Sequence, residues 1–417
     1  MLTLYKVFTF LVYYITLPYT ALAAVLGSRK WRNRLGFHKA KRADKNGPVV
    51  WLHASSMGEV NVLATLAAQI KSLAPLSDIY VTVMTVTGLE RAEKSINDAI
   101  GIGYLSLDYR VPIERFLSLV KPSVAVFIET EIWPNHICVL GERKIPVVLA
   151  NGRLSEKAHR RYLRVKSGMR QVLSNYAEMD LQTDADAARF VEIGADPDKI
   201  EVLGSLKFDA PTRNLPESER RALREQLPFS AGARIFIAGS TRNGENEIIF
   251  DVYQKLKQEF PELKLLLVPR HLDKIPQIVM SAESCGLRYL LHSKVAPESS
   301  PVDAVIVDKM GILNDLYQIC DIAFVGGTLS DIGGHNILEP VWAGIPVLYG
   351  PSIFNVGDSS RYILENGFGE MIKDGEELRE RLGAFLSGEK AYRRRKELTQ
   401  ESSRAYRTAR KIVKYLK

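Results

Sequence analysis

The sequence predicts an α/β protein made of two doubly wound domains that face each other across a cleft. Short apolar runs alternate with helical patterns along most of the 417 residues, which is typical of βαβ units in parallel sheets. The alternation stops in a charged, proline-containing stretch at residues 211–232 and then resumes, so we interpret that stretch as a linker. Ligands of such sheets bind beyond the carboxyl ends of the strands, and the loops there are the candidate sites.

Composition limits the classes of function. With 46% hydrophobic and 25% charged residues, the chain suits a folded protein of two to three domains. Cys138, Cys285 and Cys320 have no CxxC spacing, which indicates a reducing compartment and no disulfide framework or structural zinc. The net charge of +8 favours a polyanionic neighbour. Nucleic acid is disfavoured because the basic residues gather beside an apolar segment instead of among exposed aromatic residues.

Residues 1–28 are predicted to be a single membrane anchor. No charged residue occurs from Val7 to Ser28, about the ~20 residues that a membrane helix needs. A basic juxtamembrane segment follows at residues 29–47, which places the body on the cytoplasmic side and attracts anionic lipid. Its basic residues are Arg29, Lys30, Arg32, Arg34, Lys39, Lys41, Arg42 and Lys45. A cleaved signal peptide is the alternative, because residues 21–23 resemble a cleavage site, but the positive charge after it opposes export.

The first domain is predicted at residues 48–210, with acidic side chains after two of its strands. The expected strands are Val49–His53, Ile79–Met84, Val124–Ile128, Val147–Ala150, Met179–Gln182 and Val202–Leu203. Glu59 follows the first strand at a helix start, where it is either a helix-stabilising acid or a general base. Glu129 and Glu131 follow the 124–128 strand. In an extended chain they lie on one side and raise each other's pKa.

Paired carboxylates fit a glycosyl-transfer site, which needs a base near the acceptor and negative charge near a cationic transition state. We expect one of the pair instead to bind backbone N–H groups in the Trp133–Pro134 turn. Lys207 lies where the last strand of this domain ends. It is either a solvated lysine or a partner for a leaving-group phosphate.

The second domain is predicted at residues 233–417. Its expected strands are Ile235–Ala238, Lys264–Val268, Tyr289–Leu291, Val305–Val307, Ile322–Val325 and Pro346–Tyr349. Gly239–Thr241 ends one strand as a small phosphate or hydroxyl cradle. Arg270 ends another, and a guanidinium suits phosphate. Three histidines at strand or helix ends are candidate secondary contacts: His53, His271 and His335.

The stretch Phe324–Pro351 predicts a strand, a glycine-rich loop and a helix that begins at His335–Asn336. Free backbone N–H groups and the helix dipole there would bind an anion. Asn336 can cap this helix, and Glu339 either completes a capping box or contacts a ligand. The spacing GxGxxG does not occur in this stretch, which disfavours an ordinary dehydrogenase.

Seven motifs, in this order and spacing, resemble the bacterial Kdo transferase family of lipid A biosynthesis: SSMGEV, IETEIWPN, NGRLS, GSLKFD, PRH, MGI and GGHNILEP. The resemblance covers nearly the whole chain. It implies the GT-B glycosyltransferase fold, with two Rossmann-like domains. It also implies an inverting transfer of 3-deoxy-D-manno-octulosonic acid (Kdo) from CMP-Kdo to a hydroxyl group of the lipid A precursor, lipid IVA. The expected location is the cytoplasmic face of the inner membrane.

The resemblance also implies the residue roles. Glu59 would be the general base, and Glu129 and Lys207 would stabilise the transition state. The CMP contacts would be Pro269, Arg270, Met310, Gly311, Ile312, Asn336, Ile337, Leu338 and Glu339. CMP-Kdo is then a substrate, and no cofactor or metal ion is expected. The expected partners are the donor, the lipid A precursor and an anionic membrane surface.

Other readings remain open from the residues alone. A UDP-sugar transferase or a sugar epimerase of the same architecture would use similar glycine loops. A membrane-bound nucleotide-binding protein without catalysis is disfavoured by the acids at the strand ends.

Overall fold

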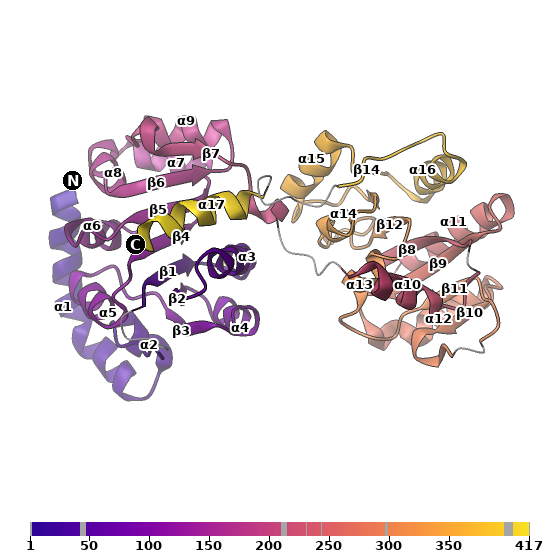
Figure 1. Cartoon of the computed structure of the whole chain (residues 1–417), viewed down its shortest axis with the longest axis horizontal. Coiled ribbons are helices and arrows are strands. Elements are labelled where there is room, and N and C mark those ends of the chain that lie inside the picture. The colour runs from indigo at the N-terminus through magenta and orange to yellow at the C-terminus, as the bar shows by residue number, and fades with distance from the viewer. Residues whose placement is uncertain are drawn as a thin grey trace. The chain divides into compact units, whose positions relative to one another are not determined.

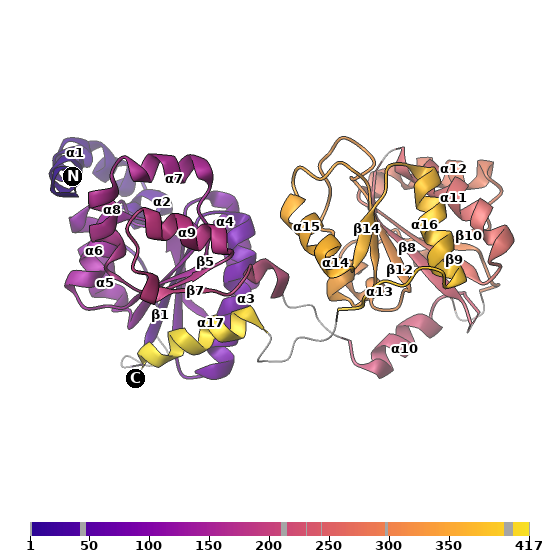
Figure 2. The same cartoon turned by 90° about the horizontal axis from the view of Figure 1, so that it is seen from above.

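The chain forms two compact units. The computed structural model describes residues 2–41, 47–209, 215–230, 232–242, 244–296, 299–395 and 403–416. Unit 1 comprises Met1–Ala210 and Leu398–Lys417, and unit 2 comprises Pro211–Glu397. Each unit is a seven-stranded, wholly parallel sheet with helices on both faces (Figures 1 and 2). The predicted class, two doubly wound α/β domains, is confirmed.

The sheet of unit 1 has the strand order β3-β2-β1-β4-β5-β6-β7. Its strands are β1 (Val49–Ala54), β2 (Asp78–Val83), β3 (Ala99–Tyr104), β4 (Val124–Ile128), β5 (Val147–Gly152), β6 (Tyr176–Leu181) and β7 (Ile200–Val202). Its helices are α1 (Leu2–Val25), α2 (Arg29–Arg34), α3 (Met57–Leu73), α4 (Val86–Ser95), α5 (Arg110–Val120), α6 (Pro134–Glu142), α7 (Glu156–Leu163), α8 (Lys166–Leu173), α9 (Asp184–Glu192) and α17 (Arg404–Val413), with the short 3-10 turns η1 (Pro197–Lys199), η2 (Leu206–Asp209) and η5 (Lys414–Leu416).

Burial on both faces explains why these strands read as continuous apolar runs. In β1, Val49 and Trp51 pack with α5, α6, α8 and α9 on one face. Val50, Leu52 and Ala54 pack with α3, α4 and α17 on the other. All six residues of β1 are buried.

Unit 2 has the strand order β10-β11-β9-β8-β12-β13-β14. Its strands are β8 (Arg234–Thr241), β9 (Leu263–Pro269), β10 (Tyr289–Leu291), β11 (Ala304–Ile306), β12 (Ile322–Val325), β13 (Val347–Tyr349) and β14 (Gly369–Met371). Its helices are α10 (Glu217–Glu225), α11 (Glu245–Glu259), α12 (Ile275–Ser284), α13 (Leu313–Tyr317), α14 (Leu338–Trp342), α15 (Gly357–Asn366) and α16 (Gly375–Ser387), with the 3-10 turns η3 (Leu272–Lys274) and η4 (His292–Lys294). The predicted strands are present within one to three residues at each end, and β3 and β14 were missed.

The C-terminal helix α17 belongs to unit 1, which corrects the predicted boundary of the second domain at residue 417. Figures 1 and 2 show α17 (yellow) beside α3 of unit 1, although more than 300 residues separate the two helices in the sequence. Ala405, Ala409 and Ile412 are fully buried in the unit 1 core. The Asp209 carboxylate accepts hydrogen bonds from the Arg404 guanidinium and the Ala405 N–H, both at 2.9 Å. Burial and this buried ion pair hold α17 on unit 1.

The predicted linker is also partly wrong, because α10 is attached to unit 2. Arg224 of α10 donates to the Ile319 carbonyl at 2.8 Å, and Leu227 is buried in the unit 2 core. Residues 211–214 and 231 of the predicted linker lie outside the described residues.

Helix α1 is long and apolar enough to cross a membrane, by length and composition. It lies along the outside of unit 1, and α2 lies beside it (Figure 1). The exposed basic side chains of the segment that follows include Lys30, Arg32, Lys39 and Lys41. Residues 42–46 of the predicted basic segment lie outside the described residues. The three cysteines are free.

Candidate active site

In unit 1 the candidate residues lie at the point where the strand order reverses. The sheet runs β3-β2-β1 in one direction and β4-β5-β6-β7 in the other. The loops that follow the carboxyl ends of β1 and β4 therefore diverge from each other. Doubly wound sheets bind their ligands in the crevice between two such loops. Glu59 follows β1, and Glu129 and Glu131 follow β4.

Glu59 is held at the first turn of α3. Its Oε2 accepts from the Ser55 N–H at 2.7 Å, and its Oε1 accepts from the Ser56 hydroxyl at 2.9 Å. Ser56 is the N-cap, and its Oγ accepts from the Glu59 N–H at 3.4 Å. This is a reciprocal capping arrangement. Burial raises the pKa of Glu59, these hydrogen bonds lower it, and the charges on Glu129 and Glu131 raise it, so that the net shift is upward.

The helix-stabilising role of Glu59 is therefore present in the structure, and it does not exclude a base role. The carboxylate is half-buried at the sheet edge, and its raised pKa makes it a stronger proton acceptor than an ordinary glutamate.

Glu129 and Lys207 form an ion pair, although 77 residues separate them in the sequence. The Lys207 Nζ lies 3.2 Å from the Glu129 Oε1, and the Arg153 Nε lies 3.1 Å from its Oε2. Glu129 is buried and has a left-handed backbone with φ of 60°. The chain turns at Glu129, so the condition under which Glu129 and Glu131 would lie on one side, an extended segment, is not met. Arg153 comes from the NGRLS motif, and its contact with Glu129 was not predicted.

Glu131 binds side chains rather than the backbone of the Trp133–Pro134 turn. Its Oε2 accepts from the Trp133 indole N–H at 2.8 Å and lies 3.3 Å from the His53 Nε2. Burial raises the pKa of Glu131, but the contacts with His53 and Trp133 lower it, and the net shift is downward. The prediction that Glu129 and Glu131 raise each other's pKa was therefore wrong for Glu131. The residue stays ionised and orients the loop.

In unit 2 the corresponding reversal lies between β8 and β12. The glycine-rich loop follows β12, as predicted, but several of its backbone N–H groups are bound within the protein. The carboxylate of Glu245, at the start of α11, accepts from the N–H groups of Gly327 (2.8 Å), Thr328 (3.1 Å) and Leu329 (3.0 Å). The Gly333 N–H donates to the Ser352 Oγ. The carboxylate of Glu245 thus binds the N–H groups at the start of the loop. The predicted anion site at the end of the loop, near His335–Asn336, stays a prediction.

The helix after this loop is shorter than predicted. It is α14, which has five residues and begins at Leu338 rather than at His335–Asn336. The Asn336 Oδ1 accepts from the Leu338 N–H at 3.2 Å, and the Asn336 amide donates to the Glu339 Oε1 at 3.3 Å. Glu339 thus binds the Asn336 side chain and does not close a capping box.

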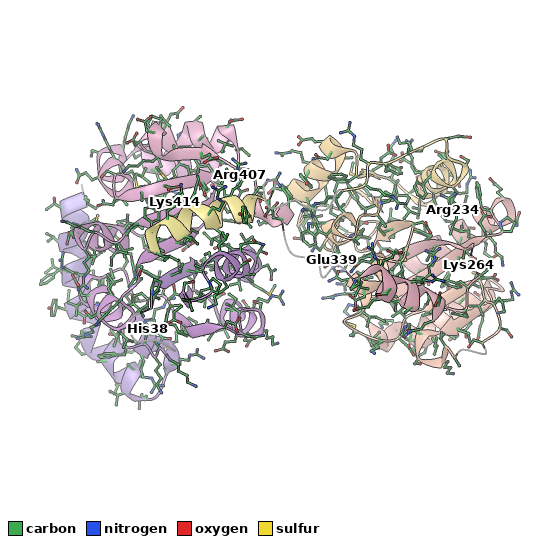
Figure 3. All side chains as sticks on the ribbon, viewed as in Figure 1. His38, Arg234, Lys264, Glu339, Arg407 and Lys414 are labelled. Carbon is green, nitrogen blue, oxygen red and sulfur yellow. The ribbon has the colours of Figure 1, made fainter. Side chains whose placement is uncertain are left out.

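Arg270 and Glu339 lie within electrostatic range of each other. Burial raises the pKa of Glu339, while the Asn336 hydrogen bond and the charge on Arg270 lower it, with a net upward shift. Figure 3 labels Glu339 on unit 2. Arg270 is exposed directly after β9, the strand next to β8. At the carboxyl ends of the strands, the sheet therefore presents a guanidinium group beside a half-buried carboxyl group. This arrangement can bind phosphate and hydroxyl groups.

Arg242 is a candidate binding residue that the sequence analysis missed. Its Nε lies 3.2 Å from the His335 Nε2, and its NH1 lies 2.6 Å from the His271 Nε2. Burial and the charges on Arg242, Arg270 and His271 lower the pKa of His335 to about 4. Two arginines and two histidine rings thus gather at the carboxyl ends of these strands. Arg242 directly follows Gly239–Thr241, the predicted phosphate or hydroxyl cradle, and this position was the signal in the sequence that could have identified it.

The remaining predicted CMP contacts lie around these strand ends. Met310 and Gly311 are exposed, and they lead through Ile312 into α13, which packs against α14. Three others are buried, which leaves mainly their backbone for contact: Pro269, Ile337 and Leu338. Within the described ranges, no three His, Cys, Asp or Glu side chains gather as ligands for a metal ion.

The chain is similar to known proteins in sequence and in fold. A sequence profile described as 3-deoxy-D-manno-octulosonic-acid transferase (kdotransferase) matches residues 29–210. A 3-deoxy-D-manno-octulosonic acid transferase of Haemophilus influenzae is 33% identical over 346 residues, which cover 83% of this chain and 81% of that protein. A bifunctional glycosyltransferase/methyltransferase of Fusobacterium nucleatum is 36% identical over 337 residues, 80% of this chain. The alignment spans only about half of that relative, 52%.

Among solved structures, the UDP-GlcNAc 2-epimerase of Neisseria meningitidis is similar, with a TM-score of 0.53 and 14% sequence identity. The match covers 88% of this chain and 99% of the epimerase. At this identity the likeness concerns the two-unit fold alone.

Proposed function

Because the chain belongs to the 3-deoxy-D-manno-octulosonic acid (Kdo) transferase family and has the GT-B fold, we propose that it is an inverting glycosyltransferase with CMP-Kdo as donor. The proposed acceptor is a hydroxyl group of the lipid A precursor, lipid IVA. One observation carries the proposal: residues from four of the family motifs interact in unit 1, beside the reversal of its strand order. They are Glu59, Glu129, Arg153 and Lys207. CMP-Kdo acts as a substrate, and the proposed reaction needs no cofactor or metal ion.

In the proposed reaction, the Glu59 carboxylate takes the proton of the acceptor hydroxyl group. The hydroxyl oxygen forms a bond to the anomeric carbon of Kdo from the face opposite CMP. The bond between that carbon and the phosphate oxygen breaks, and its electron pair leaves with CMP. The raised pKa of Glu59 supports this role, since a stronger base gains more from accepting the proton.

Glu129 and Lys207 are proposed to stabilise the charges that develop during transfer. The sugar centre becomes cationic while the leaving phosphate gains negative charge. The paired carboxylate and ammonium, 3.2 Å apart, offer one group of each sign, and Arg153 holds Glu129 in place. These contacts support an electrostatic role.

The donor half is proposed to be unit 2. Arg270 and Arg242 would bind the phosphate, and Glu339 would bind a sugar hydroxyl group of CMP. The support is the cluster of Arg242, His271 and His335 beside Arg270. Since Glu245 binds the N–H groups of Gly327, Thr328 and Leu329 at the start of the glycine-rich loop, the guanidinium groups are the proposed phosphate ligands.

The proposed location is the cytoplasmic face of the inner membrane, with α1 as the single anchor. The apolar length of α1 and the exposed basic residues after it support this location.

Mass spectrometry of the lipid product tests the proposed function directly. The full chain is incubated with lipid IVA and a CMP-Kdo generating system, and the product is expected to gain the mass of Kdo. In parallel, CMP is expected to raise the unfolding temperature more than UDP does. An unmodified lipid together with stronger protection by UDP would instead favour a UDP-sugar enzyme.

Replacing Arg270 by alanine is expected to weaken CMP binding by roughly 10–150-fold, because a hydrogen bond to a charged group contributes about 1.5–3 kcal/mol. Isothermal calorimetry with CMP measures the change. Arg288→Ala is the matched control, since Arg288 precedes β10 at the other end of the strands and pairs with Asp303 at 3.0 Å. Equal CMP affinity in the Arg270→Ala variant and the unmodified protein would count against the placement of Arg270.

A further inference from the structure

Helix α1 is apolar on the faces that it turns to the outside, and the face that it packs on unit 1 mixes polar, small and apolar side chains. The buried residues are Thr9, Tyr13, Thr20 and Ala24. Spacings of three or four residues, or sums of them, place these on one side of a helix. The exposed residues are Leu4, Val7, Phe8, Phe10, Leu11, Tyr14, Ile15, Tyr19, Leu22 and Val25. A surface helix in water has the opposite arrangement, with its apolar face on the protein.

The buried side of α1 is fixed to unit 1 by specific contacts. The Tyr5 hydroxyl donates to the Asp108 Oδ2 at 2.8 Å, and the Asn135 amide donates to the Thr9 Oγ1 at 3.0 Å. The Tyr13 ring packs on Tyr109, with ring centroids 5.6 Å apart. Asp108 in turn binds His136, so that α1 takes part in a buried polar network of unit 1.

These contacts run along nearly the whole helix. From Tyr5 to Ala24 the axis measures ~30 Å at 1.5 Å per residue, which is about the thickness of the hydrocarbon core of a bilayer. A helix that spans the bilayer has lipid on all sides over that length. For α1 to span, it would have to leave unit 1 and break the hydrogen bonds of Tyr5 and Thr9. The network around Asp108 would then lose a partner.

Charge at one end of α1 matches a lipid surface. Helix α2 lies beside the C-terminal end of α1 (Figure 1). Exposed basic side chains on and after it include Lys30, Arg32, Lys39 and Lys41, and the Phe37 ring among them is 55% exposed. Basic side chains beside exposed apolar ones are typical of a helix that lies at an anionic membrane surface.

We propose that α1 lies in the plane of the membrane, with its apolar faces in the acyl chains of one leaflet that carries anionic phospholipid, and that it does not span the bilayer. This inference rests on the proposed function at a membrane-bound lipid acceptor.

The in-plane position has a consequence for the reaction. Asn135, which binds Thr9 of α1, lies in the first turn of α6, two residues after Trp133. The loop that carries Glu129 and Glu131 leads directly into that turn. The candidate acid loop is therefore tied to the helix that enters the leaflet. A lipid acceptor in the same leaflet would present its head group beside unit 1.

Labelling of a cysteine at the N-terminal end of α1 tests the orientation. Thr3→Cys is expressed in the full chain, and inverted inner-membrane vesicles are treated with a membrane-impermeant maleimide. The native, exposed Cys285 reports on the body. For each cysteine, the labelling before permeabilisation is divided by the labelling after it. If α1 lies in the membrane plane, this ratio should be the same for the cysteine at position 3 and for Cys285. A spanning α1 predicts that Thr3→Cys reacts strongly only after permeabilisation, and this outcome would overturn the proposal.

Vesicle flotation tests the inserted face. The variant Phe8→Ser/Ile15→Ser is expected to lose at least about tenfold in affinity for vesicles of phosphatidylethanolamine and phosphatidylglycerol, because two inserted apolar side chains are removed. Leu76→Ser is the matched control, since Leu76 is 89% exposed on unit 1 outside α1. Equal losses in both variants contradict insertion of α1.

Transfer activity of the detergent-solubilised protein separates the two proposals. If the protein transfers Kdo in detergent but the labelling shows that α1 spans the bilayer, only the in-plane position of α1 is refuted. If the labelling shows an in-plane α1 but the protein does not transfer Kdo in detergent, the in-plane position is supported and the proposed reaction is refuted.

Discussion

The Glu59→Gln variant is expected to fold normally and to transfer Kdo roughly 10²–10⁴-fold more slowly than the unmodified protein, the usual loss when a general base is removed. The fold should persist because glutamine keeps a carbonyl oxygen that accepts from the Ser55 N–H and serves in a capping box. The proton acceptor, in contrast, disappears. Single-turnover transfer from CMP-Kdo, together with the unfolding temperature, measures both effects.

A second capping glutamate in the chain separates the base role from the capping role. In α16, Glu377 accepts from the Lys373 N–H at 2.9 Å, and the Asp374 carboxylate accepts from the Glu377 N–H at 2.9 Å. This repeats the arrangement of Ser56 and Glu59 in unit 2. Glu377→Gln should therefore change stability as little as Glu59→Gln and keep full transfer. If Glu59→Gln also keeps near-full transfer, Glu59 only caps its helix.

The pH profile gives an independent test of the base. Burial and the charges on Glu129 and Glu131 raise the pKa of Glu59 above 4.5, against the hydrogen bonds of Ser55 and Ser56. Only the ionised carboxylate accepts a proton, so kcat/KM should fall as the pH drops through this raised pKa. The acid limb should lie above pH 4.5 and should vanish in Glu59→Gln. A limb that persists in Glu59→Gln assigns the titration to another group.

The sequence predicted the strands that form short apolar runs, and it missed β3 and β14, in which glycine interrupts the run. In β3, a Cβ at Gly101 would lie 2.4 Å from the Tyr80 ring, and in β14 a Cβ at Gly369 would lie 1.9 Å from the Val347 carbonyl oxygen. Both glycines are needed for close approach to a neighbouring strand, but in the sequence they weaken the apolar pattern. The attachment of α17 was equally hidden, because an amphipathic helix does not reveal which sheet it covers.

The candidate site shows a similar division. The loops that carry Glu59, Glu129 and Arg270 were predictable, because each follows a readable strand. The partners within the site were not. The pairing of Glu129 with Lys207 depends on how β4 and η2 meet, and the positive φ of Glu129 cannot be read from its residue type. Glu245 was not among the predicted site residues, because only the fold shows which loop its carboxylate reaches.

Glu245→Ala is expected to lower the free energy of unfolding of unit 2 by on the order of 4 kcal/mol. Glu245 is 1% exposed, and its carboxylate accepts from four backbone N–H groups, those of Arg242, Gly327, Thr328 and Leu329. Each buried donor that loses its partner costs about 1–3 kcal/mol, and water that enters the alanine cavity offsets part of the sum. Urea unfolding followed by a unit 2 signal measures the loss.

The matched control is Glu247→Ala, in the same first turn of α11 but with an exposed side chain. Both variants remove an acid near the positive end of the helix dipole, an interaction that contributes about 0.3–1 kcal/mol. Only Glu245→Ala also removes the acceptor for the N–H groups of Gly327, Thr328 and Leu329 in the loop after β12. Hydrogen exchange should therefore accelerate at these three amides in that variant alone. Equal stability losses in the two variants would mean that the carboxylate acts through the dipole. A loss confined to Glu245→Ala would mean that the glycine loop, which carries the motif residues Asn336 and Glu339 at its end, keeps its shape because a buried acid fills it.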